Sequence, residues 1–356
     1  MRRMRIKQWD MSDPDVIRGC HEVRQAARRA DDPDGPPQSE RRLRVLLEGV
    51  RTGIPNEVWF TDGAAGDGEA GDGEAIDGEA GDGGPGVIRG WYLLQLPDQE
   101  NLDHAFVNVI VHPEHRRRGI GTALLRHAAR RAREHGRSAL GGETLLESAG
   151  DAFATRTGTK PGIVAAIRVP DVGAVPPGLV SGLRADAAAK AAGYSLVSWT
   201  GPVPEERLDG IARLMEAMND APWDYEDERW DAERVRTRIN GRIARAGTRW
   251  YTVGAVSDKT GELAAFSVLI IDPQHPEWGL QGDTGVLRHH RGHRLGTLVK
   301  TAMLEWLATA EPRLRRIKTD NAASNNYMIS INERLGFTVH GFARQHDLTV
   351  TAVLGD

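Results

Sequence analysis

The sequence has little cysteine, few aromatic residues and no long apolar run. One of its 356 residues, Cys20, is a cysteine, and 6% are aromatic. A single cysteine excludes an intramolecular disulfide and a cysteine-based zinc site, which is typical of a reducing compartment. No apolar run approaches the length that spans a bilayer, and the basic N-terminus lacks the apolar segment of a secretion signal. We therefore expect a cytoplasmic protein with no membrane partner.

Charge of one sign is concentrated in one segment. Residues 62–86 contain eight acidic residues and no basic residue, and the formal net charge of the whole chain is −4. Without this segment the chain carries +4. Such a mild positive charge suits a polyanionic ligand, but it falls below the charge density usual for a nucleic-acid binder. We expect no nucleic-acid partner.

The acidic segment has a five-residue repeat, with aspartate at positions 62, 67, 72, 77 and 82 and mainly glycine and alanine between them. Ile76 is its one large aliphatic residue. Burial of so few apolar groups does not offset the entropy of ordering the chain. We therefore expect a disordered insertion rather than a calcium-binding repeat, and we expect no metal site.

The stretch 112–136 places glycines at a turn from a strand to a helix. Residues 106–111 alternate in polarity like a strand, and Ile120, Leu124 and Ala128 then recur at helical spacing. This order predicts a strand, a short basic turn and an amphipathic helix.

Three residues in that turn, Arg116, Gly119 and Gly121, have the order Arg-x-x-Gly-x-Gly. Backbone N–H groups in the first turn of a helix lack intrahelical partners and attract anions. Glycines let a phosphate approach the backbone closely. A Walker loop is excluded because no Gly-Lys-Ser or Gly-Lys-Thr follows, and the spacing does not fit a dinucleotide fingerprint. The pattern predicts a different kind of phosphate-binding turn.

A second stretch, 288–296, repeats this arrangement. Arg291 and Gly296 match the motif, whereas Arg294 replaces its first glycine. A strongly periodic apolar helix follows, through Trp306 and Leu307. Since 356 residues are long for one core, this internal repeat predicts two copies of one fold.

Periodicity and turn residues also place the other elements. We expect helices opening near Pro14, Ser39, Pro204 and Asp231, a hairpin around 258–261, and a strand at 163–169 that completes the first copy.

The two turns resemble the acyl-coenzyme A loop of the GNAT acetyltransferases. The lead-in Val111-x-Pro113 and the helix 321–336, which ends in Gly336-Phe337, also occur in family order. The resemblance implies an α/β fold, a mixed sheet with flanking helices, in two tandem GNAT-like domains of the kind found in mycothiol synthase. We expect domains at 1–170 and 194–356, joined by a linker at 171–193.

The resemblance also implies which residues bind acetyl-coenzyme A (acetyl-CoA). In the first copy these are Val109, Val111, Arg116, Arg117, Arg118, Gly119, Gly121 and Thr122. In the second copy they are Arg291, Gly292, His293, Arg294, Gly296 and Asn325.

The catalytic residues expected from the family lie in the second copy. Asp283 stands on the strand where the family often places a carboxylate near the acceptor, and a purely structural aspartate is the competing interpretation. Asn332 occupies the position where many members carry a tyrosine acid, and Ala154 occupies it in the first copy. Since a thiol of pKa about 8.5 leaves readily, that acid is dispensable.

We therefore expect an acetyl-CoA-dependent N-acetyltransferase that acts on a primary amine of a small molecule or peptide by direct attack. The alternative is a non-catalytic protein that binds acetyl-CoA or sequesters a small molecule, as the missing tyrosines suggest. The acceptor, the active copy and the choice between monomer and homodimer remain open.

Overall fold

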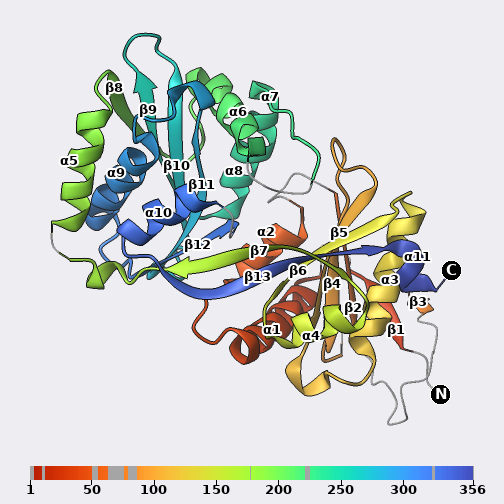
Figure 1. Ribbon diagram of the computed structural model, residues 1–356. Coiled ribbons are helices and arrows are strands. Elements are labelled where there is room, and N and C mark those ends of the chain that lie inside the picture. Colours follow the sequence, from red (N-terminus) through yellow and green to blue (C-terminus); the bar gives the residue numbers. More distant parts are fainter. Residues whose placement is uncertain are drawn as a thin grey trace. The chain divides into compact units, whose positions relative to one another are not determined.

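The computed structural model describes residues 4–9, 13–49, 55–62, 76–78, 86–176, 178–220, 225–322 and 325–355. Most of the acidic segment expected to be a disordered insertion therefore lies outside the described residues. The chain divides into two compact units, and in each of them helices flank the strands (Figure 1). Unit 1 comprises residues 1–162 and 343–356, and unit 2 comprises residues 163–342.

Unit 1 has the strand order β3-β1-β2-β4-β5-β6-β13. Its strands are β1 (Arg5–Gln8), β2 (Asn56–Thr61), β3 (Ile76–Gly78), β4 (Gly90–Gln95), β5 (His104–Val111), β6 (Ala139–Leu145) and the second part of β13 (Thr338–Thr349). Its helices are α1 (Pro14–Asp31), α2 (Glu40–Leu47), η1 (Pro113–His115), α3 (Ile120–Glu134), α4 (Ala149–Arg156) and α11 (Val350–Leu354).

Unit 2 has the strand order β7-β12-β11-β10-β9-β8. Its strands are most of β7 (Lys160–Val169), β8 (Tyr194–Thr200), β9 (Arg249–Ser257), β10 (Leu263–Ile271), β11 (Trp278–Val286) and β12 (Arg316–Ala322). Its helical elements are η2 (Val172–Ala174), α5 (Leu179–Lys190), η3 (Glu205–Arg207), α6 (Leu208–Glu216), η4 (Ala217–Asp220), α7 (Ala232–Arg234), the π-helical η5 (Val235–Asn240), α8 (Gly241–Ala246), η6 (Arg288–His290), α9 (Leu295–Ala310) and α10 (Asn326–Arg334).

The expected α/β class, with a mixed sheet and flanking helices, is confirmed. Parallel pairs such as β5 with β6 occur beside antiparallel pairs such as β4 with β5. Several helix starts follow the expected capping chemistry. Asp13 caps α1, which begins at Pro14, and the Ser39 side chain accepts a hydrogen bond from Arg42 N at the start of α2.

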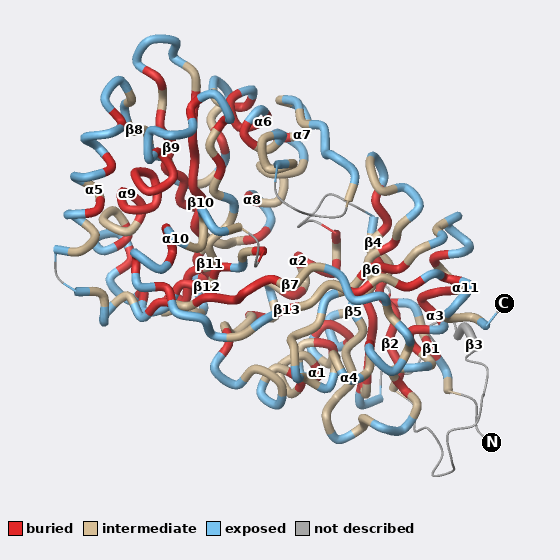
Figure 2. The backbone as a smooth tube through the Cα atoms, viewed as in Figure 1, coloured by how far each residue is buried: buried red, intermediate tan, exposed pale blue. Residues whose placement is uncertain are grey.

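Each unit has an apolar core on both faces of its strands. Tyr92 and Leu94 on β4 pack on one side with α3, whereas Trp91 and Leu93 pack on the other side with α1 and α2. This alternation is the two-residue period of a strand. In unit 2 one core includes α5 and α9, the other includes α6 and α8, and buried residues concentrate along α9 and β10 (Figure 2).

The last strands are distributed in a way that the sequence analysis does not anticipate. Residues 165–168 of β7, expected to complete the first copy, pair with 319–322 of β12 in unit 2. Residues 343–349 of β13 pair with β6 in unit 1, where His346 lies 2.8 Å from Thr144 Oγ1 and 2.9 Å from Thr159 Oγ1. Backbone pairing carries no sequence motif, so the periodicity of these strands does not reveal their partners.

The segment 171–193, expected to be a linker, contains helix α5. Its residues Leu183 and Ala187 are buried in the core that α9 also lines. Across the described residues, no helix is long and apolar enough to cross a membrane.

Candidate functional site

In each unit a pair of parallel strands separates after three residue pairs. His104–Phe106 of β5 pairs with Ala139–Gly141 of β6, and Trp278–Leu280 of β11 pairs with Arg316–Lys318 of β12. Beyond these pairs, β6 continues alongside β13, and β12 continues alongside β7. In the later part of β5 and of β11, one edge thus no longer pairs with the parallel neighbour. Each of these two strands is followed directly by a basic turn.

The two basic turns have the same backbone path. We call residues 113–122 loop 1 and residues 288–297 loop 2. Both begin with a 3-10 turn, and each then has two residues in the left-handed region. These are Arg117 (φ 63°) and Gly119 (φ 77°) in loop 1, and Gly292 (φ 88°) and Arg294 (φ 57°) in loop 2. The positions correspond one to one.

Both loops present backbone donors at the start of a helix. The first helical hydrogen bond runs from Ala123 N to Gly119 O in loop 1 and from Leu298 N to Arg294 O in loop 2, each at 3.0 Å. N–H groups earlier than these lack an intrahelical acceptor, and the positive end of the helix dipole lies there. Either loop is therefore suited to bind an anion.

The motif arginines, Arg116 and Arg291, hold the loops in place through hydrogen bonds. Arg116 makes two hydrogen bonds to the Asp31 carboxylate, at 2.8 and 2.6 Å, and its Nε donates to Val111 O. Arg291 repeats this in unit 2, with 2.6 Å to Asp220 Oδ2 and a bond from Nε to Val286 O. Each guanidinium holds its loop to the preceding strand and to the end of a helical segment. The guanidinium therefore positions the loop backbone, and through that backbone it would contribute to the expected binding of a phosphate.

Several charged or titratable loop residues face solvent. Arg117, Arg118, His293 and Arg294 are exposed, as is Thr122. A Cβ at Gly119 would meet no atom within 4 Å. Loop 1 therefore offers open space beside its backbone, and loop 2 carries the Arg294 side chain at the corresponding position.

The strands before the loops differ. β5 pairs with β4 in unbroken register over the described pairs from Gly90–Val111 to Gln95–Phe106. Val109 and Val111 on β5 pack against the core of unit 1. β11 shifts register against β10, because Ser267 pairs with Thr284 whereas Leu269 pairs with Gln281. The extra residue makes a β-bulge at Gly282 and Asp283.

Side chains hold this bulge in place. Gln281 Nε2 donates to Val268 O at 2.6 Å and to Ser267 Oγ at 3.1 Å. Val268 is the β10 residue that the shifted register leaves without a partner on β11. The Gln281 amide thus replaces a missing ladder bond. Bulges bend a strand and re-aim its side chains, often next to an active site.

The bulge carries Asp283, an expected catalytic residue. Its side chain is exposed to solvent. The protein packed around the carboxyl nevertheless raises its pKa above the ordinary value, while the positive charge of Arg242 acts in the opposite direction. A carboxylate with a raised pKa is a stronger proton acceptor, which is the property a general base requires.

The two expected asparagines have different surroundings. Asn325 caps α10, and its Oδ1 accepts a hydrogen bond from Met328 N at 3.2 Å. Asn332 is fully buried: its Oδ1 accepts from Lys300 Nζ at 2.7 Å, and its Nδ2 donates to Asn321 Oδ1 at 2.6 Å. With its amide engaged at both ends inside the core, Asn332 is placed to hold Lys300 rather than to meet a departing thiolate. Its catalytic role stays a prediction that this geometry does not support.

Sequence reasoning missed Tyr327, which lies beside loop 2. A Cβ at Gly296 would stand 3.7 Å from the Tyr327 hydroxyl oxygen. Tyr327 is 56% exposed. The protein around its hydroxyl raises its pKa above the ordinary value, while the charges of Arg291 and Arg294 act in the opposite direction. Its position five residues before Asn332 puts it on another side of α10, and that side faces the loop. Residues 221–224 lie outside the described residues.

Known proteins are similar to this chain. The model of the acetyltransferase (GNAT) family matches residues 74–147 and 215–337, more than half of the chain. A tandem GNAT protein from the clavulanic acid biosynthesis pathway is similar over its full length, with 27% identity and a TM-score of 0.74, covering 97% of this chain and 98% of that chain.

More distant structures share the fold. A GCN5-related N-acetyltransferase from Sphaerobacter thermophilus has 17% identity and a TM-score of 0.59, covering 97% of this chain and 95% of that one. A putative acetyltransferase from Pyrococcus horikoshii has 11% identity and a TM-score of 0.53, covering 98% and 90%. Among curated protein sequences, none matches this chain.

Proposed function

Because the chain belongs to the GNAT acetyltransferase family and is of its tandem type, we propose that this N-acyltransferase moves the acetyl group of acetyl-CoA to a primary amine of a small molecule or peptide. The amine attacks the thioester directly. Two phosphate-suited loops, each next to a strand edge outside the parallel ladder, support this proposal.

Transfer takes place in unit 2. The observation that carries this assignment is the β-bulge at Gly282 and Asp283 on β11, beside a strand edge that β12 leaves after Leu280. β5 has unbroken register at the corresponding place in unit 1. Of these two strands, β11 alone combines a distorted backbone with a carboxylate whose pKa is raised.

The described residues supply two of the requirements of the chemistry. Asp283 accepts the proton of the attacking amine, since the protein packed around its carboxyl raises the pKa. Backbone N–H groups of β11, on the edge where β12 no longer pairs, donate to the thioester carbonyl oxygen as negative charge develops on it. Acetyl-CoA itself supplies a thiolate leaving group, which departs without an acid.

Both loops bind acetyl-CoA. Loop 2 keeps the left-handed backbone of loop 1 although an arginine replaces a glycine, so its N–H groups keep the same directions. The exposed Arg294 adds a charged fork suited to phosphate. Loop 1 has the open space at Gly119, but the regular β5 leaves unit 1 without the bulge and the carboxylate of unit 2. Unit 1 therefore suits the alternative function, binding without turnover.

The test is release of free thiol from acetyl-CoA with a panel of primary amines. Asp283→Asn should lower kcat/KM by roughly 10²–10⁴, the usual contribution of a general base. The exposed Asp209→Asn on α6 is the matched control and should leave the rate unchanged. Because the pKa of Asp283 is raised, activity should fall as pH drops and the carboxyl becomes protonated. No thiol release with any amine would refute the enzymatic proposal, and equal rates for the two variants would remove Asp283 from it.

A further inference from the structure

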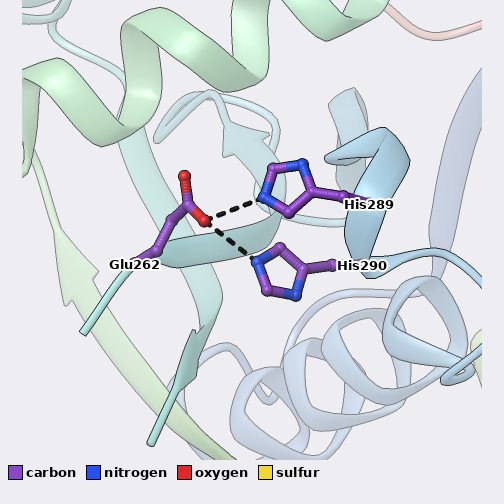
Figure 3. Close-up of side chains that lie close together, drawn as sticks. All are labelled: Glu262, His289 and His290. Carbon is purple, nitrogen blue, oxygen red and sulfur yellow. Dashed lines mark hydrogen bonds and ion pairs between the residues drawn. The ribbon is translucent and has the colours of Figure 1, made fainter. Parts of the chain in front are cut away.

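Three side chains with metal-binding atoms meet at the start of loop 2. Glu262 stands just before β10, and His289 and His290 lie in η6 (Figure 3). Glu262 Oε2 lies 2.9 Å from His289 Nε2 and 3.0 Å from His290 Nε2. One potential ligand atom from each of the three residues lies within 4.8 Å of the others. In the part of the chain that the structure describes, this is the one group of its kind.

The donor set suits a particular class of ion. Two imidazole nitrogens and one carboxylate oxygen are ligands that Zn²⁺ prefers, and they leave a coordination position for water. Hard ions such as Mg²⁺ and Ca²⁺ instead require several oxygen ligands. His289 is 63% exposed, whereas Glu262 and His290 are 24% and 11% exposed, so an ion has access from one side and support from the other.

A second layer of contacts orients these side chains. The Tyr194 hydroxyl lies 2.8 Å from His290 Nδ1, which leaves Nε2 directed at the cluster. Arg213 Nε lies 3.5 Å from the other carboxylate oxygen of Glu262, so Oε2 remains on the side of the histidines. Metal-binding histidines usually have such a partner at their second nitrogen, because it fixes the tautomer and the ring orientation.

The cluster is absent from the equivalent place in unit 1. The bonds from His112 N to Arg89 O and from Leu287 N to Ala264 O align the two copies. By this alignment Val87, Glu114 and His115 correspond to Glu262, His289 and His290. Val87 is 77% exposed and offers no ligand atom. The cluster is therefore not required by the shared fold.

We propose that Glu262, His289 and His290 bind one divalent transition-metal ion of the Zn²⁺ class. The ion ties the β9–β10 hairpin to the start of loop 2 and leaves an open coordination position. The sequence analysis expects no metal site. Glu262 and His289 are 27 residues apart along the chain, so no local motif indicates this group. This inference is independent of the acyltransfer reaction.

The test is titration of the untagged full-length protein with Zn²⁺ in competition with a chromophoric chelator. The native protein should bind one equivalent. Glu262→Gln and the exposed His289→Ala should each lose it, and Tyr194→Phe should bind roughly 10-fold more weakly. His275→Ala is the matched control and should bind like the native protein. His275 lies 3.6 Å from Glu277, and among the described residues this pair belongs to no group of three potential ligands.

A spectroscopic readout separates coordination from nonspecific binding. Co²⁺ in place of Zn²⁺ should give the intense visible absorption of a four-coordinate site in the native protein and in His275→Ala, but not in His289→Ala. Circular dichroism should show that His289→Ala folds normally, as its surface position predicts. No Zn²⁺ binding by the native protein, or binding by His289→Ala and Glu262→Gln that equals that of the native protein, would overturn the proposal and leave a hydrogen-bonded cluster only.

Discussion

Loop 1 and loop 2 have the same backbone path, but arginine and glycine occupy its two left-handed positions in reverse order. Loop 1 places arginine at its first left-handed position and glycine at its second, whereas loop 2 reverses this order. The left-handed region costs a non-glycine residue about 1–2 kcal/mol. Each loop therefore bears this cost once, at a different residue. The comparison teaches that the path from strand to helix imposes the loop conformation, and that glycine makes it less costly without being required at either position.

The strands before the loops and the helices after them also differ between the units. β11 has a bulge with Asp283, and β5 is regular. The buried pair Lys300 and Asn332 in unit 2 corresponds to Leu125 and Ala154 in unit 1, both of which are buried and apolar. Unit 2 therefore holds polar and titratable groups at places where unit 1 is purely structural.

The largest effect is expected from blocking loop 1. Gly119→Glu puts a side chain and a negative charge where a phosphate would approach the backbone, so binding of acetyl-CoA should fall from two equivalents to one in titration calorimetry. Gly136→Glu is the matched control, because Gly136 is also left-handed (φ 72°) with nothing within 4 Å of a Cβ, at the other end of α3. Complete loss of binding in Gly119→Glu would break the comparison, since loop 2 would then bind no cofactor.

A smaller effect is expected from the buried Lys300. Burial lowers its pKa to about 7, below its value in the unfolded chain. Between these two pKa values the unfolded state binds more protons than the folded state, so stability rises as pH increases above 7. Lys300→Met removes this pH-dependent contribution to the free energy of unfolding. In urea denaturation, the free energy of unfolding of the native protein should increase between pH 7 and pH 9 by about 2 kcal/mol more than that of the variant.

The control for that measurement is Leu125→Met, at the equivalent buried position of unit 1. Its unfolding free energy should follow the pH dependence of the native protein. Parallel pH profiles for Lys300→Met and the native protein would show that Lys300 stays charged in the folded state.

The smallest effect is expected from relieving the backbone at Arg294. Arg294→Gly gives loop 2 the glycine that loop 1 has, and it should raise the free energy of unfolding by about 1 kcal/mol, because φ is 57° there. Arg117→Gly, at φ 63° in loop 1, should have a similar effect. If Arg294→Gly were destabilising while Arg117→Gly stabilised the protein, the Arg294 side chain would contribute contacts that outweigh its strain.

Much of the site could be predicted from local patterns. Arg116, Gly119 and Gly121 were located from their spacing after an alternating strand, and α3 begins at Ile120 as that spacing predicts. For Asp283 the prediction of a place near the acceptor comes from the family resemblance, and the structure puts the residue on the β-bulge of β11. Asn332 shows the limit of this reasoning. Its helical position was predicted, but its burial against Lys300 depends on two distant elements.

The sequence by itself determined the family, the two copies and the loops, because strand alternation, helical periodicity and glycine spacing are local properties of the chain. The tertiary structure alone decided which strands pair at the end of each unit, since β13 pairs with β6 about 200 residues away and backbone hydrogen bonds do not depend on side-chain identity. It also decided that Glu262 meets His289 and His290. That contact requires β10 and loop 2 to lie side by side, and no local pattern in the chain records this proximity.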